Sequence, residues 1–248
     1  MRTEQPKMIY LKDYQAPDYL IDETHLTFEL YDDHSLVHAQ LVMRRNPEAG
    51  AGLPPLVLDG QQLELVSLAL DDRELSAGDY QLTDSHLTLQ PTQERFVIDS
   101  TVRIHPESNT ALEGLYKSSG MFCTQCEAEG FRTITFFPDR PDVLSRYTVR
   151  IEADAAFPYL LSNGNLWEGG EVDSTQPEGR HYVVWNDPFP KPAYLFALVA
   201  GELDVLEDSF VTMSGRTVAL KVFVDPGMAA RGAYAMDSLK RSMKWDEE

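Results

Sequence analysis

The feature of this sequence that most constrains its fold is an alternation of apolar and polar residues with a period of two. The apolar positions of the first two runs are Leu26, Phe28, Leu30, Val37, Ala39, Leu41 and Met43. Successive side chains of a β-strand point to opposite faces, so this pattern predicts strands with one buried face. The turn-forming residues Asp32-Asp33-His34 separate the two runs, which predicts an antiparallel pair.

The alternation continues along most of the chain. It returns over residues 63–70, 80–83, 86–89 and 96–104, and later over 147–153, 181–185, 194–199 and 218–224. A loop rich in Gly, Ala and Pro, residues 47–55, interrupts it. Short strands at this spacing predict a mainly β fold, a sandwich or saddle of antiparallel sheets. A chain of 248 residues is long enough for one large β domain or two smaller domains.

Only the end of the sequence has the period of a helix. Gly232, Met236, Leu239 and Met243 recur at intervals that place them on one helix face. We therefore expect the longest helix of the chain over residues 229–246. The sequence ends inside this pattern without the Gly or Asn that commonly follows a helix, so we expect it to be part of a longer polypeptide.

The composition excludes several classes of partner. Forty acidic and 21 basic side chains give a formal charge of −19, which repels nucleic acids and anionic membrane surfaces. We find neither a signal sequence nor an apolar run long enough to span a membrane. Two cysteines in 248 residues are typical of a reducing compartment, so we expect a cytoplasmic protein without disulfides.

Two histidines, His34 and His38, have the spacing at which a helix presents two ligands to one zinc ion. The surrounding period of two predicts a turn and a strand instead of a helix. The residue after the first histidine is Ser35, where the helical zinc motif requires Glu. We therefore expect two surface histidines at these positions and no metal site.

Cys123 and Cys126 form a Cys-x-x-Cys motif, which occurs in zinc knuckles and in thioredoxin-like redox proteins. A structural zinc site would need a second pair, which the sequence lacks, and no βαβ pattern surrounds the first. We expect two buried, reduced thiols, and a metal or redox role remains an alternative.

Residues 109–142 have neither the period of a strand nor that of a helix. Their polar side chains are mixed with aromatic residues and prolines, as in loops that are fixed for binding. From physical chemistry alone, an irregular connection with a structural Glu129–Arg132 ion pair is an equally good interpretation. The sequence also lacks a phosphate-binding Gly-rich loop and the Gly-x-Ser-x-Gly motif of serine hydrolases.

These irregular residues resemble the zinc aminopeptidases of the bacterial aminopeptidase N type. The resemblance rests on residues 110–142, 161–165 and 187–201, and the segments 13–19 and 238–248 fit the same family. The match therefore extends over essentially the whole chain.

The resemblance implies an N-terminal all-β domain over residues 1–201 and the beginning of a thermolysin-like catalytic domain over residues 202–248. In this family the Gly-Ala-Met-Glu-Asn motif, the His-Glu-x-x-His zinc helix, a third zinc ligand and a catalytic Tyr all follow later in the chain. The resemblance therefore implies an enzyme of the membrane alanyl aminopeptidase type, with zinc in the full-length protein. It implies no zinc, no catalytic residue and no activity in this part alone.

One pair of site residues of the family does have counterparts here. The family's Gln-x-Glu, which holds the free amino group of a peptide, is similar to Gln125-Cys126-Glu127. The resemblance thus implies that Glu127 pairs with the substrate's ammonium group and that Gln125 accepts a hydrogen bond from it. Met121 and Phe122 lie close enough to contribute to a side-chain pocket, although core packing is the better interpretation.

Two alternative functions remain. A non-catalytic relative would use the same β domain as a protein-interaction scaffold, which the intact Gln-x-Glu disfavours. A relative of the bifunctional leukotriene hydrolases would act on an epoxide, and residues 137–142 fit that group poorly. The expected partners are peptides with a free N-terminus and the catalytic domain of the same protein.

Overall fold

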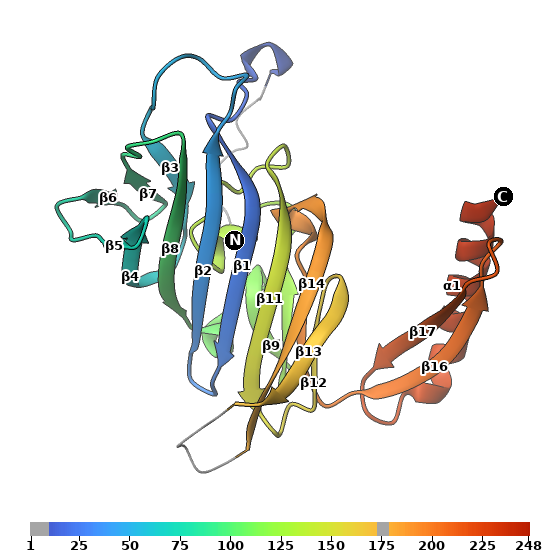
Figure 1. The fold of residues 1–248 in the computed structure, drawn as a ribbon. Coiled ribbons are helices and arrows are strands. Elements are labelled where there is room, and N and C mark those ends of the chain that lie inside the picture. Colours follow the sequence, from blue (N-terminus) through green and yellow to red (C-terminus); the bar gives the residue numbers. More distant parts are fainter. Residues whose placement is uncertain (1–9, 173–178) are drawn as a thin grey trace. The chain divides into compact units, whose positions relative to one another are not determined.

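The computed structural model describes residues 10–172 and 179–248. The chain folds into two compact units (Figure 1). The first comprises Met1–Ala155 and Leu160–Ala200, and the second comprises Ala156–Tyr159 and Gly201–Glu248. The first unit is built mainly from strands, as the alternation of the sequence predicts. No helix in the described part of the chain is both long enough and apolar enough to cross a membrane.

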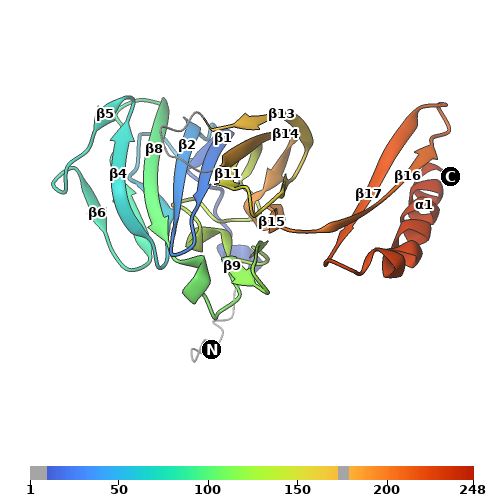
Figure 2. The ribbon, with the colours of Figure 1, turned by 90° about the horizontal axis from the view of Figure 1, so that it is seen from below.

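An eight-stranded sheet dominates the first unit. Its strand order, which can be followed across Figure 2, is β13-β14-β11-β1-β2-β8-β4-β5. The strands are β1 (Tyr19–Leu30), β2 (Ser35–Arg45), β4 (Glu64–Leu70), β5 (Arg73–Glu74), β8 (Arg95–Ile104), β11 (Leu144–Asp154), β13 (Asn165–Glu171) and β14 (Arg180–Pro192).

One pair of strands in this sheet departs from the antiparallel pairing that the sequence predicts. Strand β1 pairs with β2 in antiparallel fashion, but it pairs with β11 in parallel, with Glu23 opposite Arg146 and Glu29 opposite Glu152. More than a hundred residues separate these two strands. A connection of that length can return the chain to the same end of the sheet, whereas a short turn cannot.

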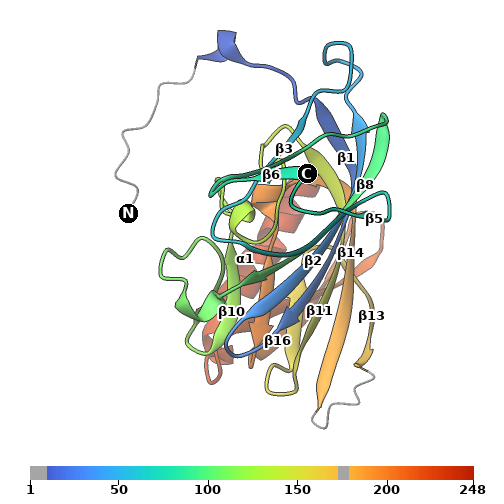
Figure 3. The same cartoon turned by 90° about the vertical axis from the view of Figure 1, so that its left-hand side faces the viewer.

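Two smaller sheets lie on one side of the large sheet (Figure 3). One has the order β3-β7-β6 and the other β12-β15-β10-β9. Their strands are β3 (Leu56–Asp59), β6 (Tyr80–Leu82), β7 (His86–Leu89), β9 (Gly114–Ser118), β10 (Met121–Gln125), β12 (Tyr159–Ser162) and β15 (Leu198–Gly201). Single 3-10 turns are η1 (Leu11–Asp13), η2 (Pro106–Ser108), η3 (Phe131–Thr133) and η4 (Ala193–Leu195).

Aromatic side chains fill the space between the large sheet and the smaller ones. The ring centroid of Phe131, on η3, lies 4.8 Å from that of Phe137, 5.3 Å from that of Phe196 and 6.3 Å from that of Tyr147. Phe196 also stacks on Phe28 of β1 at 5.8 Å. All five side chains are buried, so the segment that carries η3 is fixed directly to the core.

The predicted strand over residues 194–199 is only partly correct. Residues Ala193–Leu195 form the 3-10 turn η4, and the strand β15 begins at Leu198. Pro192 is the last residue of β14, and η4 follows it directly.

The second unit contains a hairpin and a helix. Strands β16 (Asp204–Val211) and β17 (Thr217–Val224) pair in antiparallel register, and η5 (Ala229–Gly232) leads into α1 (Ala233–Glu247). Gly232 packs near Leu206 and Val222 on one face of the hairpin, and Met236 is the buried residue of α1. The predicted final helix is confirmed, although its first turn is 3-10.

Candidate functional site

The candidate site is a short loop that leaves the end of β10. Gln125 is the last residue of this strand and lies opposite Gly114 of β9. The loop continues from Cys126 to Gly130 and ends at η3. The chain is thus held on one side by a β-ladder and on the other by the buried ring of Phe131.

The two residues of the predicted anchor, Gln125 and Glu127, both reach the surface of the first unit. The Nε2 of Gln125 donates a hydrogen bond of 3.3 Å to the backbone carbonyl of Glu127, which leaves the side-chain oxygen of Gln125 as an acceptor. Among the described residues no hydrogen bond or ion pair engages the Glu127 carboxylate. The peptide bond between Glu127 and Ala128 is cis. A free carboxylate beside a free amide oxygen is suited to an ammonium ligand.

Between these two exposed side chains, Cys126 points into the protein and is 2% exposed. Its carbonyl accepts a hydrogen bond of 2.8 Å from the backbone N–H of Gly130, which closes the loop. A Cβ atom on Gly130 would lie 2.5 Å from the carbonyl oxygen of Gln125 and 3.0 Å from the nitrogen of Gly114. Only glycine fits there, because a side chain would push the loop away from β9.

Arg132 of η3 connects the loop to its surroundings. Its Nε lies 3.1 Å from Oδ2 of Asp139, and its Nη1 lies 3.6 Å from Oε2 of Glu129 and 3.8 Å from Oδ1 of Asp59. The predicted Glu129–Arg132 pair therefore exists, but it is one contact of a larger cluster. No signal in the sequence pointed to Asp59, because only the folded chain brings it beside Arg132.

Burial sets the electrostatics of this cluster. It raises the pKa of the Asp139 carboxyl, and the neighbouring guanidinium of Arg132 opposes that rise. Arg132 also donates to Asp139 from its backbone N–H at 3.1 Å. A buried carboxylate is costly without a cation, so Arg132 and Asp139 depend on each other.

The two cysteines are free thiols with different surroundings. Cys126 is buried, as expected, but Cys123 on β10 is only partly covered, and its side chain is hydrogen-bonded with Tyr116. Burial raises the pKa of both thiols, that of Cys126 to about 12. A thiol with a raised pKa is a poor nucleophile at neutral pH, which disfavours redox chemistry at Cys126.

The buried thiol predicts a loss of stability at alkaline pH. Above pH 9.0 the unfolded chain releases the Cys126 proton, while the folded chain keeps it until about pH 12. The free energy of unfolding therefore falls as the pH rises, by up to about 1.4 kcal/mol per pH unit from this group. We expect Cys126→Ala to lose less stability than the wild type between pH 8 and pH 10 in urea unfolding. Equal losses in the two proteins would contradict this expectation.

The histidines that were considered as zinc ligands have separate partners. His34 lies in the turn after β1, with Nδ1 at 2.7 Å from Asp33, whereas His38 on β2 contacts Glu29 at 2.8 Å and Thr101 at 3.0 Å. Across residues 10–172 and 179–248, no group of three or more His, Cys, Asp and Glu side chains has the arrangement of a metal site.

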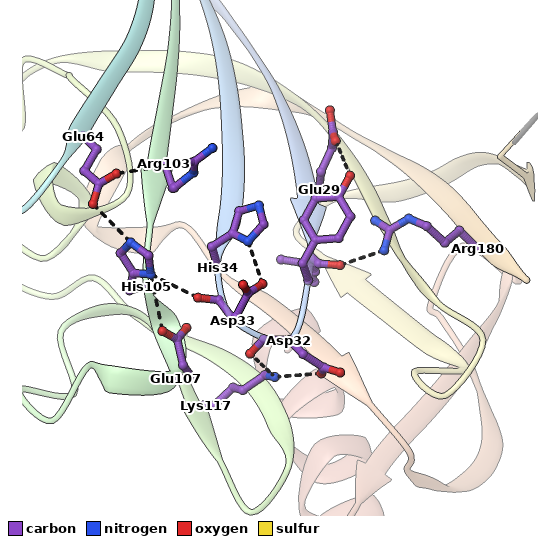
Figure 4. A network of polar contacts seen from close by, with 12 residues as sticks. Glu29, Asp32, Asp33, His34, Glu64, Arg103, His105, Glu107, Lys117 and Arg180 are labelled. Atoms are coloured by element: carbon purple, nitrogen blue, oxygen red, sulfur yellow. Dashed lines mark hydrogen bonds and ion pairs between the residues drawn. The ribbon is translucent and has the colours of Figure 1, made fainter. Parts of the chain in front are cut away.

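A further polar network surrounds the turn that carries His34 (Figure 4). His105, at the end of β8, contacts the carbonyl of Asp33 at 3.0 Å and the carboxylates of Glu64 at 3.2 Å and Glu107 at 3.4 Å. The hydrogen bond with Asp33 is the main cause of the raised pKa of His105. These contacts join the ends of several strands.

Of Met121 and Phe122, which were considered for a side-chain pocket, Phe122 lies in the core. Phe122 is fully buried, with the Nζ of Lys117 at 4.6 Å from its ring centroid, and Met121 is half-buried at the start of β10. Core packing therefore accounts for Phe122.

The chain is similar to known proteins along its whole length. The model of the peptidase M1 N-terminal domain matches residues 22–195. Aminopeptidase N of Caulobacter vibrioides is 58% identical over the whole of this chain, and aminopeptidase N of Escherichia coli is 50% identical over 99% of it. This chain spans only 28% and 27% of the length of these two relatives.

Solved structures show the same fold. Aminopeptidase A of Legionella pneumophila, in complex with aspartic acid, matches with a TM-score of 0.89 and 37% identity over 96% of this chain and 28% of its own. The M1 zinc metallopeptidase of Deinococcus radiodurans matches with a TM-score of 0.70 and 16% identity over 85% of this chain and 48% of its own. The sequence motifs, the family match and the high identity to these relatives agree, and the chain belongs to the family of the peptidase M1 N-terminal domain.

Proposed function

We propose that this chain is the N-terminal part of a zinc aminopeptidase that removes N-terminal amino acids from peptides. We refer to the longer protein as the full-length enzyme. Within it, residues 1–201 form the N-terminal domain and residues 202–248 begin the catalytic domain. The separation of the chain into two compact units near Gly201 supports this division.

The observation that carries the proposal is the exposed Gln125–Glu127 pair on a loop that the core fixes. The Glu127 carboxylate is exposed and has no hydrogen bond or ion pair within the described residues. The α-ammonium group of a peptide supplies the matching cation, with Gln125 as a second acceptor. A blocked N-terminus lacks that charge, so this site selects peptides with a free amino group.

We assign the zinc of the full-length enzyme to residues outside this chain. Zinc is held in proteins by three or four His, Cys or carboxylate ligands, and the described residues contain no such group. We therefore assign the metal and the hydrolytic step to residues beyond this chain. The contribution of this chain is to bind and orient the amino end of the substrate, which places the first peptide bond for cleavage.

This assignment predicts a clear difference between the chain and the full-length enzyme. We expect the purified 248-residue chain to bind no stoichiometric zinc and to leave an aminoacyl reporter uncleaved. The full-length enzyme is expected to bind zinc and to cleave the reporter. Elemental analysis and a fluorogenic assay measure both quantities. One tightly held zinc ion in the isolated chain would contradict the assignment and would direct attention to Cys123 and Cys126.

We also propose that the full-length enzyme acts in the cytoplasm and binds neither nucleic acid nor membranes. The formal charge of −19 and the presence of only two cysteines support this part of the proposal.

A further inference from the structure

We propose that Arg132 is the positioning residue of the amine anchor, and that it holds the Gln125–Glu127 loop in place through Asp139 and Asp59. This inference rests on the proposed function. It assigns Arg132 no contact with the substrate. Its role is to fix the backbone from which Glu127 projects.

The contacts of Arg132 with Asp139 are numerous for a single pair. The guanidinium donates from Nε to Oδ2 and from Nη2 to the backbone carbonyl, both at 3.1 Å, and the backbone N–H of Arg132 also donates to Oδ2 at 3.1 Å. The two side chains are 13% and 2% exposed. A planar fork with several donors makes such contacts, and the ammonium group of a lysine does not.

Asp59 connects the Arg132–Asp139 pair to the three-stranded sheet that contains β3. It ends β3, and its Oδ2 accepts a hydrogen bond of 3.1 Å from the backbone N–H of Asp139. Its own backbone exchanges two hydrogen bonds with Phe137, of 2.8 and 3.0 Å. The carbonyl of Arg132 accepts a further bond of 2.9 Å from Gln61, just after β3. The start of η3 is thus fastened to the three-stranded sheet.

Three residues, Glu129, Gly130 and Cys126, connect Arg132 to the anchor residues. Glu129 pairs with the guanidinium at 3.6 Å, and Gly130 between them donates its N–H to the carbonyl of Cys126 at 2.8 Å. Cys126 lies between Gln125 and Glu127 in the chain.

The Glu127 carboxylate has no fixing contact of its own among the described residues, so the backbone alone determines where it lies. A displacement of about 1 Å at a binding group can cost on the order of 100-fold in rate. The cluster around Arg132 therefore matters for activity as well as for folding.

The test is a double-mutant cycle in the full-length enzyme, with Arg132→Lys and Glu127→Ala made singly and together. We expect Arg132→Lys to lower kcat/KM for an aminoacyl reporter by about 10-fold to 100-fold, because the charge remains but the fork is lost. In the Glu127→Ala background, Arg132→Lys is expected to lower kcat/KM by less than about 3-fold, because no carboxylate is left to position.

Arg140→Lys is the matched control for this cycle. Arg140 is also partly buried and forms a forked pair with Asp142, with bonds of 2.8 and 2.7 Å, but its further contact is the carbonyl of Gln15 and not the anchor loop. We expect the kcat/KM of this variant to stay within about 2-fold of the wild type.

A second measurement separates positioning from a general loss of stability. In the 248-residue chain, Arg132→Lys is expected to speed hydrogen exchange at the N–H of Gly130, while the amides that pair β2 with β8 keep their protection. Faster exchange throughout the large sheet would mean that Arg132 only supports the fold.

The outcomes distinguish the two proposals. If Glu127→Ala leaves kcat/KM unchanged, the proposed anchor itself is wrong. If Glu127→Ala is damaging but Arg132→Lys costs the same factor in both backgrounds, the anchor stands and the positioning role of Arg132 is overturned.

Discussion

Replacement of Glu127 by alanine in the full-length enzyme is expected to lower kcat/KM by about 30-fold to several-thousand-fold. The proposed function requires the catalytic domain of the full-length enzyme to cover this site, so that the substrate's ammonium group is removed from water there. Loss of one partner of such a buried charged pair costs roughly 2–5 kcal/mol. Each 1.4 kcal/mol corresponds to about a factor of ten. Steady-state kinetics with an aminoacyl reporter measure the effect.

The neighbouring Gln125 supplies the comparison for this prediction. Gln125→Ala is expected to cost less, because a neutral hydrogen bond is worth only about 0.5–1.5 kcal/mol net. Zinc content and thermal stability are expected to stay near the wild-type values in both variants, since both side chains are exposed. A Glu127→Ala enzyme with unchanged kcat/KM would exclude the anchoring role. One that loses activity only by unfolding would make Glu127 a structural residue.

The alternation of the sequence was sufficient to predict the strands whose two faces differ. Strand β2 shows this, since Val37, Leu41 and Met43 are buried while Gln40 is exposed. Strand β13 gave no such signal, because all of its residues are exposed at the edge of the sheet. Strands β9 and β10 were also missed, because their burial follows the irregular packing under the anchor loop and not a simple period.

The anchor residues could be named only through the resemblance to a family, since local physics left their segment as an irregular loop. Of the contacts that support them, the sequence predicted only the Glu129–Arg132 pair. Asp59 precedes Asp139 by 80 residues, and nothing in either local sequence indicates the bond between them. Contacts of this range follow from the arrangement of the sheets, as does the parallel pairing of β1 with β11.

A large loss of stability is expected when Phe131 is replaced by alanine. Its ring is fully buried against Phe137 and Phe196, and removal of a buried phenylalanine side chain costs about 3–5 kcal/mol. That is a substantial share of the roughly 5–15 kcal/mol by which a typical domain is stable. Urea unfolding of the 248-residue chain measures it. A Trp245→Phe background restricts tryptophan fluorescence to the first unit, which contains Trp167 and Trp185.

Leu166→Ala is the control for this loss, because the side chain of Leu166 is 59% exposed on β13 and its removal is expected to change stability by less than about 0.5 kcal/mol. A Phe131→Ala protein as stable as this control would mean that the aromatic cluster does not hold the loop. Phe131 and Glu127 are only four residues apart, yet one faces the core and the other faces solvent. Their alanine variants should therefore give opposite results, with Phe131→Ala losing stability and Glu127→Ala losing activity at unchanged stability.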